Sequence, residues 1–201
     1  MKKVECYTLG IAQVNTYVVW NERHVLVVDP GSNPATLIRE LQMQDAIVDA
    51  VVLTHGHFDH IAGIDDIVKA FSCPVYVNPL DKALLKDPIL NVSMMEPIIV
   101  QTSPKYLQLG KQMIGTFQLE VIDAPGHTEG SSLIIWENHM FSGDVLFKGS
   151  IGRTDFVTGS NSKMQQSLAL LKQLDPSYIV HPGHGPNTTL QQELLENPYL
   201  R

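Results

Sequence analysis

Four potential metal ligands lie within six residues, in the sequence His-Gly-His-Phe-Asp-His at 55–60. In an extended turn, His55 and His57 point to the same side of the chain. Asp59 and His60 reach a second point nearby as the chain bends into a helix. Imidazoles and a carboxylate packed this densely usually share a cation. The segment therefore predicts a metal site rather than a histidine-rich loop in solvent.

Three later residues could complete such a site. His127, Asp144 and His184 each follow a short apolar run at a turn that contains glycine. Taken singly, each is more often an ordinary turn or capping residue than a ligand. Because strand ends that share one rim of a sheet converge, their common layout favours a joint role once a metal loop is granted.

Together these segments supply seven donor residues: His55, His57, Asp59, His60, His127, Asp144 and His184. Two four-coordinate centres need eight donors, and seven residues supply them if one carboxylate bridges. Imidazole and carboxylate without thiolate suit Zn²⁺, Fe²⁺ or Mn²⁺, of which we expect two Zn²⁺ per chain. A hydroxide held between two cations is a strong nucleophile near pH 7, so the predicted chemistry is hydrolysis without a serine or cysteine nucleophile. Cys6 and Cys73 lie outside the ligand segments and are expected to be small buried residues.

The composition is that of a globular protein. The 201 residues include 44% hydrophobic and 17% charged residues, with a formal net charge of −7. The apolar runs are too short to span a bilayer, and the acidic balance disfavours nucleic acid and anionic membranes as partners. No apolar stretch follows the first lysines, so we expect a cytoplasmic protein with reduced cysteines. The site itself would carry about +1 with two divalent cations, two carboxylates and a hydroxide, which favours an anionic substrate. No feature of the sequence indicates an oligomeric state.

The elements that must position these residues alternate between short strands and helices. Apolar runs bounded by turn residues predict strands at 4–9, 14–20, 24–28, 48–54, 75–77, 117–122, 132–136, 139–142 and 178–181. Helical spacing and capping residues predict helices at about 34–44, 61–71, 161–174 and 188–196, with a helical turn at 81–85. Segment 88–104 carries no clear pattern. Because strands cluster in both halves and helices finish each half, we predict an α+β fold in which two sheets pack face to face with helices outside, as one domain over 1–201.

At the ligand segments the chain resembles the metallo-β-lactamase-fold hydrolases, specifically the short form of hydroxyacylglutathione hydrolase (glyoxalase II). The resemblance covers nearly the whole chain and rests on the motifs Thr-His-Gly-His-Phe-Asp-His at 54–60, Ala-Pro-Gly-His-Thr at 124–128, Phe-Ser-Gly-Asp at 141–144, Ser-Ile-Gly-Arg-Thr-Asp-Phe at 150–156 and Pro-Gly-His-Gly-Pro at 182–186. It implies a four-layer αββα sandwich of two mixed sheets. It also implies a thioesterase that cleaves hydroxyacyl-glutathione thioesters, such as S-lactoylglutathione, with a metal-bridging hydroxide.

The resemblance also implies roles for individual residues. One metal would be held by His55, His57 and His127, and the other by Asp59, His60 and His184. Asp144 would bridge the two metals, and Asp59 would orient the nucleophilic hydroxide. Arg153 falls where the family places a basic glutathione contact.

The chain departs from the family after its last ligand. Glyoxalase II continues into a C-terminal helical domain that helps bind glutathione, whereas 17 residues follow His184 here. Gly185 and Pro186 also replace a Glu-Tyr pair whose tyrosine touches glutathione. The resemblance therefore predicts the chemistry better than the substrate.

Two other activities share these motifs. The persulfide dioxygenases use one Fe²⁺, whose ligands here would be His55, His127 and Asp144, and a lactonase would use the same ligand set as the thioesterase. A β-lactamase is disfavoured by the missing export signal and the missing cysteine ligand, and a tRNA-processing nuclease by the scattered Lys and Arg.

The remaining histidines and one methionine pair are assigned smaller roles. His181 could support a ligand from behind. His24 and His139, beside polar residues at strand starts, are expected to face solvent, and the pair at 94–95 is expected to contribute packing.

Overall fold

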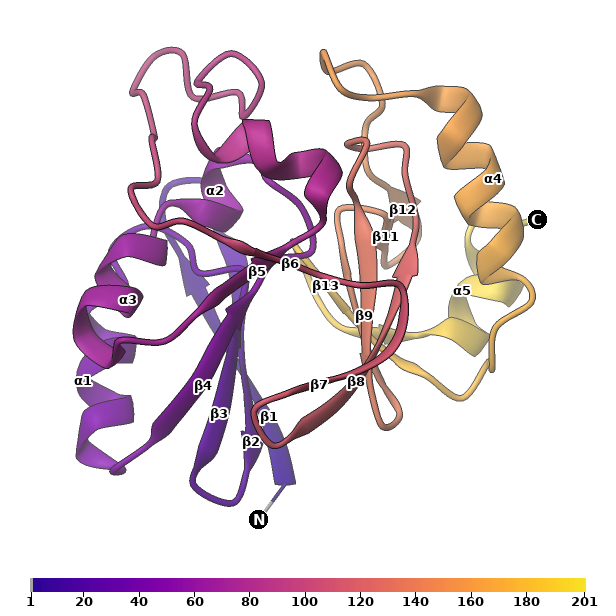
Figure 1. Cartoon of the computed structure of the whole chain (residues 1–201). Helices are drawn as coiled ribbons and strands as arrows, with labels where there is room; N and C mark the ends of the chain where they lie inside the picture. The colour runs from indigo at the N-terminus through magenta and orange to yellow at the C-terminus, as the bar shows by residue number, and fades with distance from the viewer. Residues whose placement is uncertain (1) are drawn as a thin grey trace.

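The first sheet is built from the N-terminal half of the chain. The computed structural model describes residues 2–201, and Figure 1 shows two packed sheets with helices on their outer faces. The order in the first sheet is β1-β2-β3-β4-β5-β6, antiparallel from β1 to β3 and parallel from β3 to β6. Its strands are β1 (Lys2–Leu9), β2 (Val14–Asn21), β3 (His24–Val28), β4 (Ile47–Val52), β5 (Val75–Val77) and β6 (Lys105–Tyr106).

The second sheet comes from the C-terminal half. Its order is β14-β13-β10-β9-β8-β7, antiparallel except for the parallel pair of β10 and β13. Its strands are β7 (Gly110–Ile114), β8 (Phe117–Asp123), β9 (Ser132–Trp136), β10 (His139–Gly143), β13 (Ile179–Pro182) and β14 (Thr188–Thr189). A separate two-stranded sheet joins β11 (Leu146–Phe147) and β12 (Ser150–Ile151).

Helices cover both outer faces of the sandwich. The first sheet carries α1 (Ala35–Met43), α2 (Phe58–Ile61) and α3 (Ile64–Phe71), and the second carries α4 (Asn161–Leu171) and α5 (Leu190–Glu196) (Figure 1). A 3₁₀ helix, η1 (Pro79–Leu85), covers the predicted helical turn. None of the helices within 2–201 has both the length and the apolar character needed to cross a bilayer.

The prediction of one helix over 61–71 is wrong at its N-terminal end. The chain forms α2 and α3 instead, separated at Ala62 and Gly63. A side chain at Gly63 would lie 2.3 Å from the backbone oxygen of Gly31, so the chain passes too close to the end of the first sheet for any other residue. Asp59 and His60 therefore lie on α2, a short helix separate from α3.

Three apolar layers hold the four structural layers together. Strand residues alternate between the helix-facing and the sheet-facing side, as Val18 and Val19 do in β2 and as Ile134 and Ile135 do in β9. The middle layer, between the two sheets, is built from both halves of the chain. This architecture confirms the predicted α+β sandwich. Cys73 is buried as expected, whereas Cys6 is exposed on the edge strand β1.

Candidate metal centre

All seven predicted donor residues gather at one rim of the sandwich. His55 and His57 follow β4, and Asp59 and His60 lie in α2. The second half supplies the remaining donors from the turn after β8, the end of β10 and the turn after β13: His127, Asp144 and His184. Neither sheet could build this site alone, because the donors come from both.

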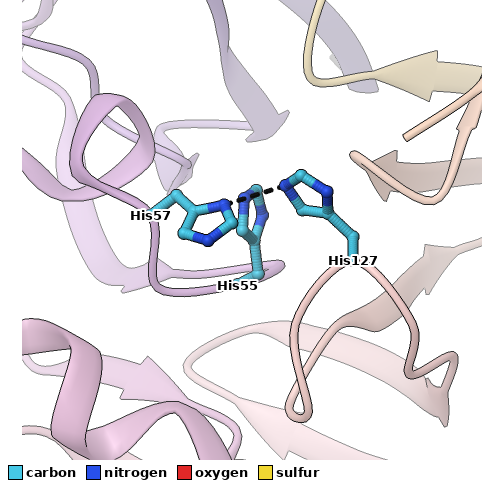
Figure 2. A group of neighbouring side chains, drawn as sticks. All are labelled: His55, His57 and His127. Carbon is cyan, nitrogen blue, oxygen red and sulfur yellow. Dashed lines mark hydrogen bonds between the residues drawn. The ribbon is translucent and has the colours of Figure 1, made fainter. Parts of the chain in front are cut away.

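The first ligand group is a triangle of imidazoles (Figure 2). Ring nitrogens of His55, His57 and His127 lie within 4.8 Å of one another. His57 Nδ1 lies 2.8 Å from His127 Nε2. His127 Nδ1 lies 2.7 Å from the backbone oxygen of Arg153, to which it can donate a hydrogen bond. That bond leaves the lone pair of Nε2 directed into the site.

The second ligand group combines a carboxylate with two imidazoles. Donor atoms of Asp59, His60 and His184 also lie within 4.8 Å of one another, with Asp59 Oδ2 3.1 Å from His184 Nε2. Asp144 lies between the groups: Oδ1 is 3.4 Å from His60 Nε2, and Oδ2 is 3.4 Å from His127 Nε2. One carboxylate therefore faces both groups.

Several of these donor atoms are buried without a hydrogen-bond partner among residues 2–201. They are Nε2 of His55, His57 and His60, and Oδ1 of Asp144. An unpaired buried polar atom costs about 1–3 kcal/mol, and native proteins keep such atoms where an ion or water satisfies them. Nitrogen and oxygen donors in this number fit a pair of divalent transition-metal ions.

The protonation states of the two groups differ. Burial, followed by the neighbouring imidazoles, lowers the pKa of His55, and burial with His127 lowers the pKa of His57 to about 3. Burial acts in the same direction on His60 and His184, but nearby carboxylates outweigh it and raise the pKa of both. Asp144 keeps a lowered pKa because its histidine neighbours outweigh its burial. The imidazoles of His55 and His57 are therefore held neutral, so their lone pairs are free to bind a cation.

The chain matches known proteins along nearly its whole length. The profile of the "Metallo-beta-lactamase superfamily" matches residues 9–184. The chain belongs to this superfamily. Among curated relatives, it is 35% identical to a protein named "Probable metallo-hydrolase YqgX" from Bacillus subtilis, over 96% of this chain and 94% of the relative. It is 32% identical to "Hydroxyacylglutathione hydrolase GloC" from Haemophilus influenzae, over 98% of this chain and 97% of the relative.

Two solved structures superpose on this chain along nearly its whole length. The crystal structure of the BLEG-1 B3 metallo-beta-lactamase superposes with a TM-score of 0.93 at 37% identity, covering 98% of this chain and 99% of that one. The structure of TTHA1623 in a di-iron-bound form superposes with a TM-score of 0.88 at 36% identity, covering 98% and 100%. Superfamily members are metal-dependent hydrolases, which agrees with the donor geometry described above.

Two carboxylates that the sequence analysis missed hold the ligands of this superfamily site in place. Asp29 Oδ2 lies 2.9 Å from His60 Nδ1, and the same side chain accepts hydrogen bonds from the backbone N–H and hydroxyl of Thr54 at 2.8 and 2.6 Å. Asp29 directly follows β3 in the sequence. Because β3 and β4 are parallel neighbours, its position next to the ligand loop could have been inferred from strand pairing.

Asp81 is the second carboxylate, and it is fully buried in η1. It accepts hydrogen bonds from the backbone N–H of Gly56 at 2.9 Å, the hydroxyl of Thr128 at 2.7 Å and the backbone N–H of Gly130 at 2.7 Å. Gly56 lies between two ligands, and Thr128 follows a third. Burial raises the pKa of Asp81, and these hydrogen bonds oppose that rise. No local motif marks this residue.

Gly56 is required for space. A side chain there would lie 2.6 Å from Cβ of Leu84, because η1 packs directly against the ligand loop.

A cavity of about 440 Å³ opens over the ligands. Phe156 and Arg153 line one side of it, with the guanidinium 4.4 Å from the ring centroid. The same guanidinium donates two hydrogen bonds to Asp155, each at 2.7 Å, and lies largely in solvent. Arg153 therefore lies at the mouth of the metallo-hydrolase site, and its backbone oxygen contacts His127 directly.

Three histidines lie outside the ligand groups and differ from expectation. His181 Nε2 lies 2.8 Å from His139 Nδ1, and its ring stacks on Phe141, so the contact expected between His181 and a ligand is not formed. His139 and His24 are half-buried rather than solvent-facing. His24 Nδ1 lies 2.7 Å from Asp49 Oδ1.

Proposed function

We propose that this metallo-hydrolase is a dinuclear thioesterase that cleaves hydroxyacyl-glutathione-like thioesters. One observation carries the proposal: seven nitrogen and oxygen donor residues form two groups that share Asp144. In this proposal His55, His57 and His127 hold one metal, while Asp59, His60 and His184 hold the other. We expect Zn²⁺, and the di-iron form of TTHA1623 supports Fe²⁺ as the alternative.

The reaction needs no covalent intermediate with the protein. When two divalent cations are bound, they lower the pKa of water to about 7 and polarise the carbonyl under attack. Asp59 lines the cavity beside His184, where it accepts a hydrogen bond from the attacking water and orients it. Water adds to the thioester carbonyl carbon, the carbon–sulfur bond breaks, and the proton that the water loses goes to the departing sulfur. Asp29 and Asp81 keep the ligand loops in position throughout.

The thiol part of the substrate is assigned to the Arg153 side of the cavity. The Arg153 guanidinium is exposed there beside Phe156, within reach of a ligand that enters the cavity. A peptide thiol with free carboxylates suits such a cation, which supports glutathione. The relative named hydroxyacylglutathione hydrolase, at 32% identity, supports the same substrate class.

The test combines metal counting with turnover on one sample. Protein purified without chelator is analysed for zinc, iron and manganese, then assayed with S-lactoylglutathione, a panel of lactones and glutathione persulfide. We expect two metals per chain and fastest turnover of the thioester. One iron per chain with oxygen-dependent turnover of the persulfide would overturn the proposal in favour of a dioxygenase, and preferred turnover of a lactone would overturn the substrate class.

A further inference from the structure

A second hollow adjoins the metal centre, and Arg153 does not line it. Its volume is about 440 Å³, and it shares three lining residues with the cavity over the ligands: Phe58, Asp59 and Val92. The two hollows therefore meet beside a proposed metal ligand. We call the second hollow the side groove.

Apolar side chains form the rim of the side groove. One wall is the turn between β1 and β2, where Ile11 is 95% exposed. The opposite wall is the loop at 92–98, where Met95 is 100% exposed. Segment 94–95 was expected to contribute packing, but both methionines are exposed. Apolar side chains gathered in this way beside a catalytic site mark a surface that a ligand covers.

Buried hydrogen bonds tie down the loop that forms this wall. Asn91 is fully buried, and its amide donates hydrogen bonds to the backbone oxygens of Leu84 and Ile98 at 2.8 and 2.9 Å. Its neighbour Val92 has a φ of +67°, which a β-branched residue rarely adopts. Such strain persists where the surroundings enforce it, and it clusters at ligand sites. Here it places Val92 at the junction of the two hollows.

The charges of the side groove select against an anionic group. Its charged lining residues are Asp59 and Glu96, and no Lys or Arg lines it among the residues that the structure describes. Asp59 holds a metal in the proposed function, so a carboxylate that enters would face Glu96 with no Lys or Arg of the groove beside it. The anionic part of a substrate is therefore directed to the Arg153 side, and an uncharged part to the side groove.

We propose that the side groove binds an uncharged alkyl chain on the acyl part of the thioester, longer than a lactoyl group. This proposal rests on the thioesterase function. It assigns the two ends of the substrate to the two adjoining hollows, with the scissile carbonyl at the ligands where the hollows meet. Longer acyl chains then bind more tightly because each added methylene leaves water for the apolar walls.

The test uses thioethers, which bind without being cleaved. S-alkyl derivatives of glutathione and of the neutral thiol N-acetylcysteamine, from methyl to octyl, are titrated into the metal-loaded protein by calorimetry. Full burial of a methylene would tighten Kd by about fourfold, so we expect two- to fourfold per methylene in both series. Kd values that do not change with chain length, or no binding at any length, would overturn the side groove as an acyl site. Turnover of S-lactoylglutathione on the same sample reports separately on the thioesterase function.

Variants locate the bound chain. The double change Ile11→Ser and Met95→Ser removes apolar area from both walls at exposed positions, so the fold is not at risk. We expect it to lower the gain per methylene to below about twofold. Met43→Ser removes another exposed methionine, from the end of α1 and outside the groove, and should retain the full gain. If the double variant also retains the full gain in affinity per methylene, the alkyl chain binds elsewhere and the proposal is wrong.

Discussion

The two ligand groups of this metallo-hydrolase differ in their residue types and in the direction of their pKa shifts. The first is three buried imidazoles, of which His55 and His57 have lowered pKa values, and the second pairs a carboxylate with imidazoles whose pKa values are raised. The second group is also more open, since the His184 side chain is 30% exposed. His55 and His57 therefore offer free lone pairs at neutral pH, whereas His60 and His184 must release protons before they bind a metal. We expect the first group to hold its metal more tightly.

Loss of Asp144, the carboxylate between the groups, should have the largest effect, because it acts on both metals and not on one. Asp144→Ala deprives both groups of a donor. We expect metal affinity to fall by more than the roughly 100-fold that loss of a supporting partner costs, with activity lost in parallel. Metal analysis after dialysis and turnover on the same sample check this. Asp175→Ala, which removes a turn carboxylate that accepts a hydrogen bond from Ser177, is the control and should retain metal. Full metal content and turnover in Asp144→Ala would rule out the bridging role.

Disturbing the first group alone should have the next largest effect. Asp81→Asn replaces a carboxylate oxygen with an N–H₂ group that faces an N–H donor, which loosens the loops of His57 and His127. We expect metal affinity of the first group to fall by about 10- to 100-fold. Competition with a chromophoric chelator measures it.

A matched control for this variant lies on α3. Asp65 accepts the same kinds of hydrogen bond, from the backbone N–H groups of Gln101 and Thr102 and from the Thr102 hydroxyl, away from the ligands. Asp65→Asn should lower Tm without changing metal affinity. Equal loss of metal in both variants would show that Asp81 contributes only general stability.

Lower pH should release the metal of the second group before that of the first. As pH falls through the raised pKa values of His60 and His184, protons compete with the second metal, whereas His57 stays unprotonated until pH approaches about 3. We expect metal content to fall from two per chain to one as pH drops below neutral, before the last metal leaves. In the metal-free protein, a fall in pH has the opposite effect on folding: protonation of His60 and His184 stabilises the fold. Raised pKa values stabilise the fold below the unfolded value and that stability is lost as pH rises through the folded value. Loss of both metals in one step would contradict the expectation that the first group holds its metal more tightly.

The smallest effect is expected at the cavity mouth. Arg153→Ala should raise KM for glutathione thioesters by up to about fivefold with kcat little changed, because an exposed cation contributes about 1 kcal/mol or less. KM for a neutral N-acetylcysteamine thioester should not change. If both values of KM rise equally, Arg153 does not contact the anionic part of the substrate.

Local motifs were enough to predict the donors but not their supports. His55, His57, Asp59 and His60 are close in sequence, and a glycine turn marks each later donor, so their convergence could be expected from spacing. Their division into two groups was implied by the family resemblance. Asp81 depends on contacts with segments 25 and 47–49 residues away, which no local pattern shows. The side groove was also missed, because its walls come from a hairpin turn and from a loop without periodic pattern.

The sandwich was predicted and the break between α2 and α3 was not. Alternating apolar strands determine the layers, and that pattern is local. The break depends on how closely Gly63 approaches Gly31, which lies on a different element. Spacing of apolar residues continued through the break because both helices face the same layer.

Because each half of the chain supplies part of the donor set, metal binding couples the two sheets. A bound cation acts as a cross-link between residues about 70 positions or more apart, formed after both halves have folded. A ligand that binds only the folded state at 100 times its Kd adds about 2.7 kcal/mol to the free energy of unfolding. Metal supply would then govern how long the folded protein lasts as well as how fast it works.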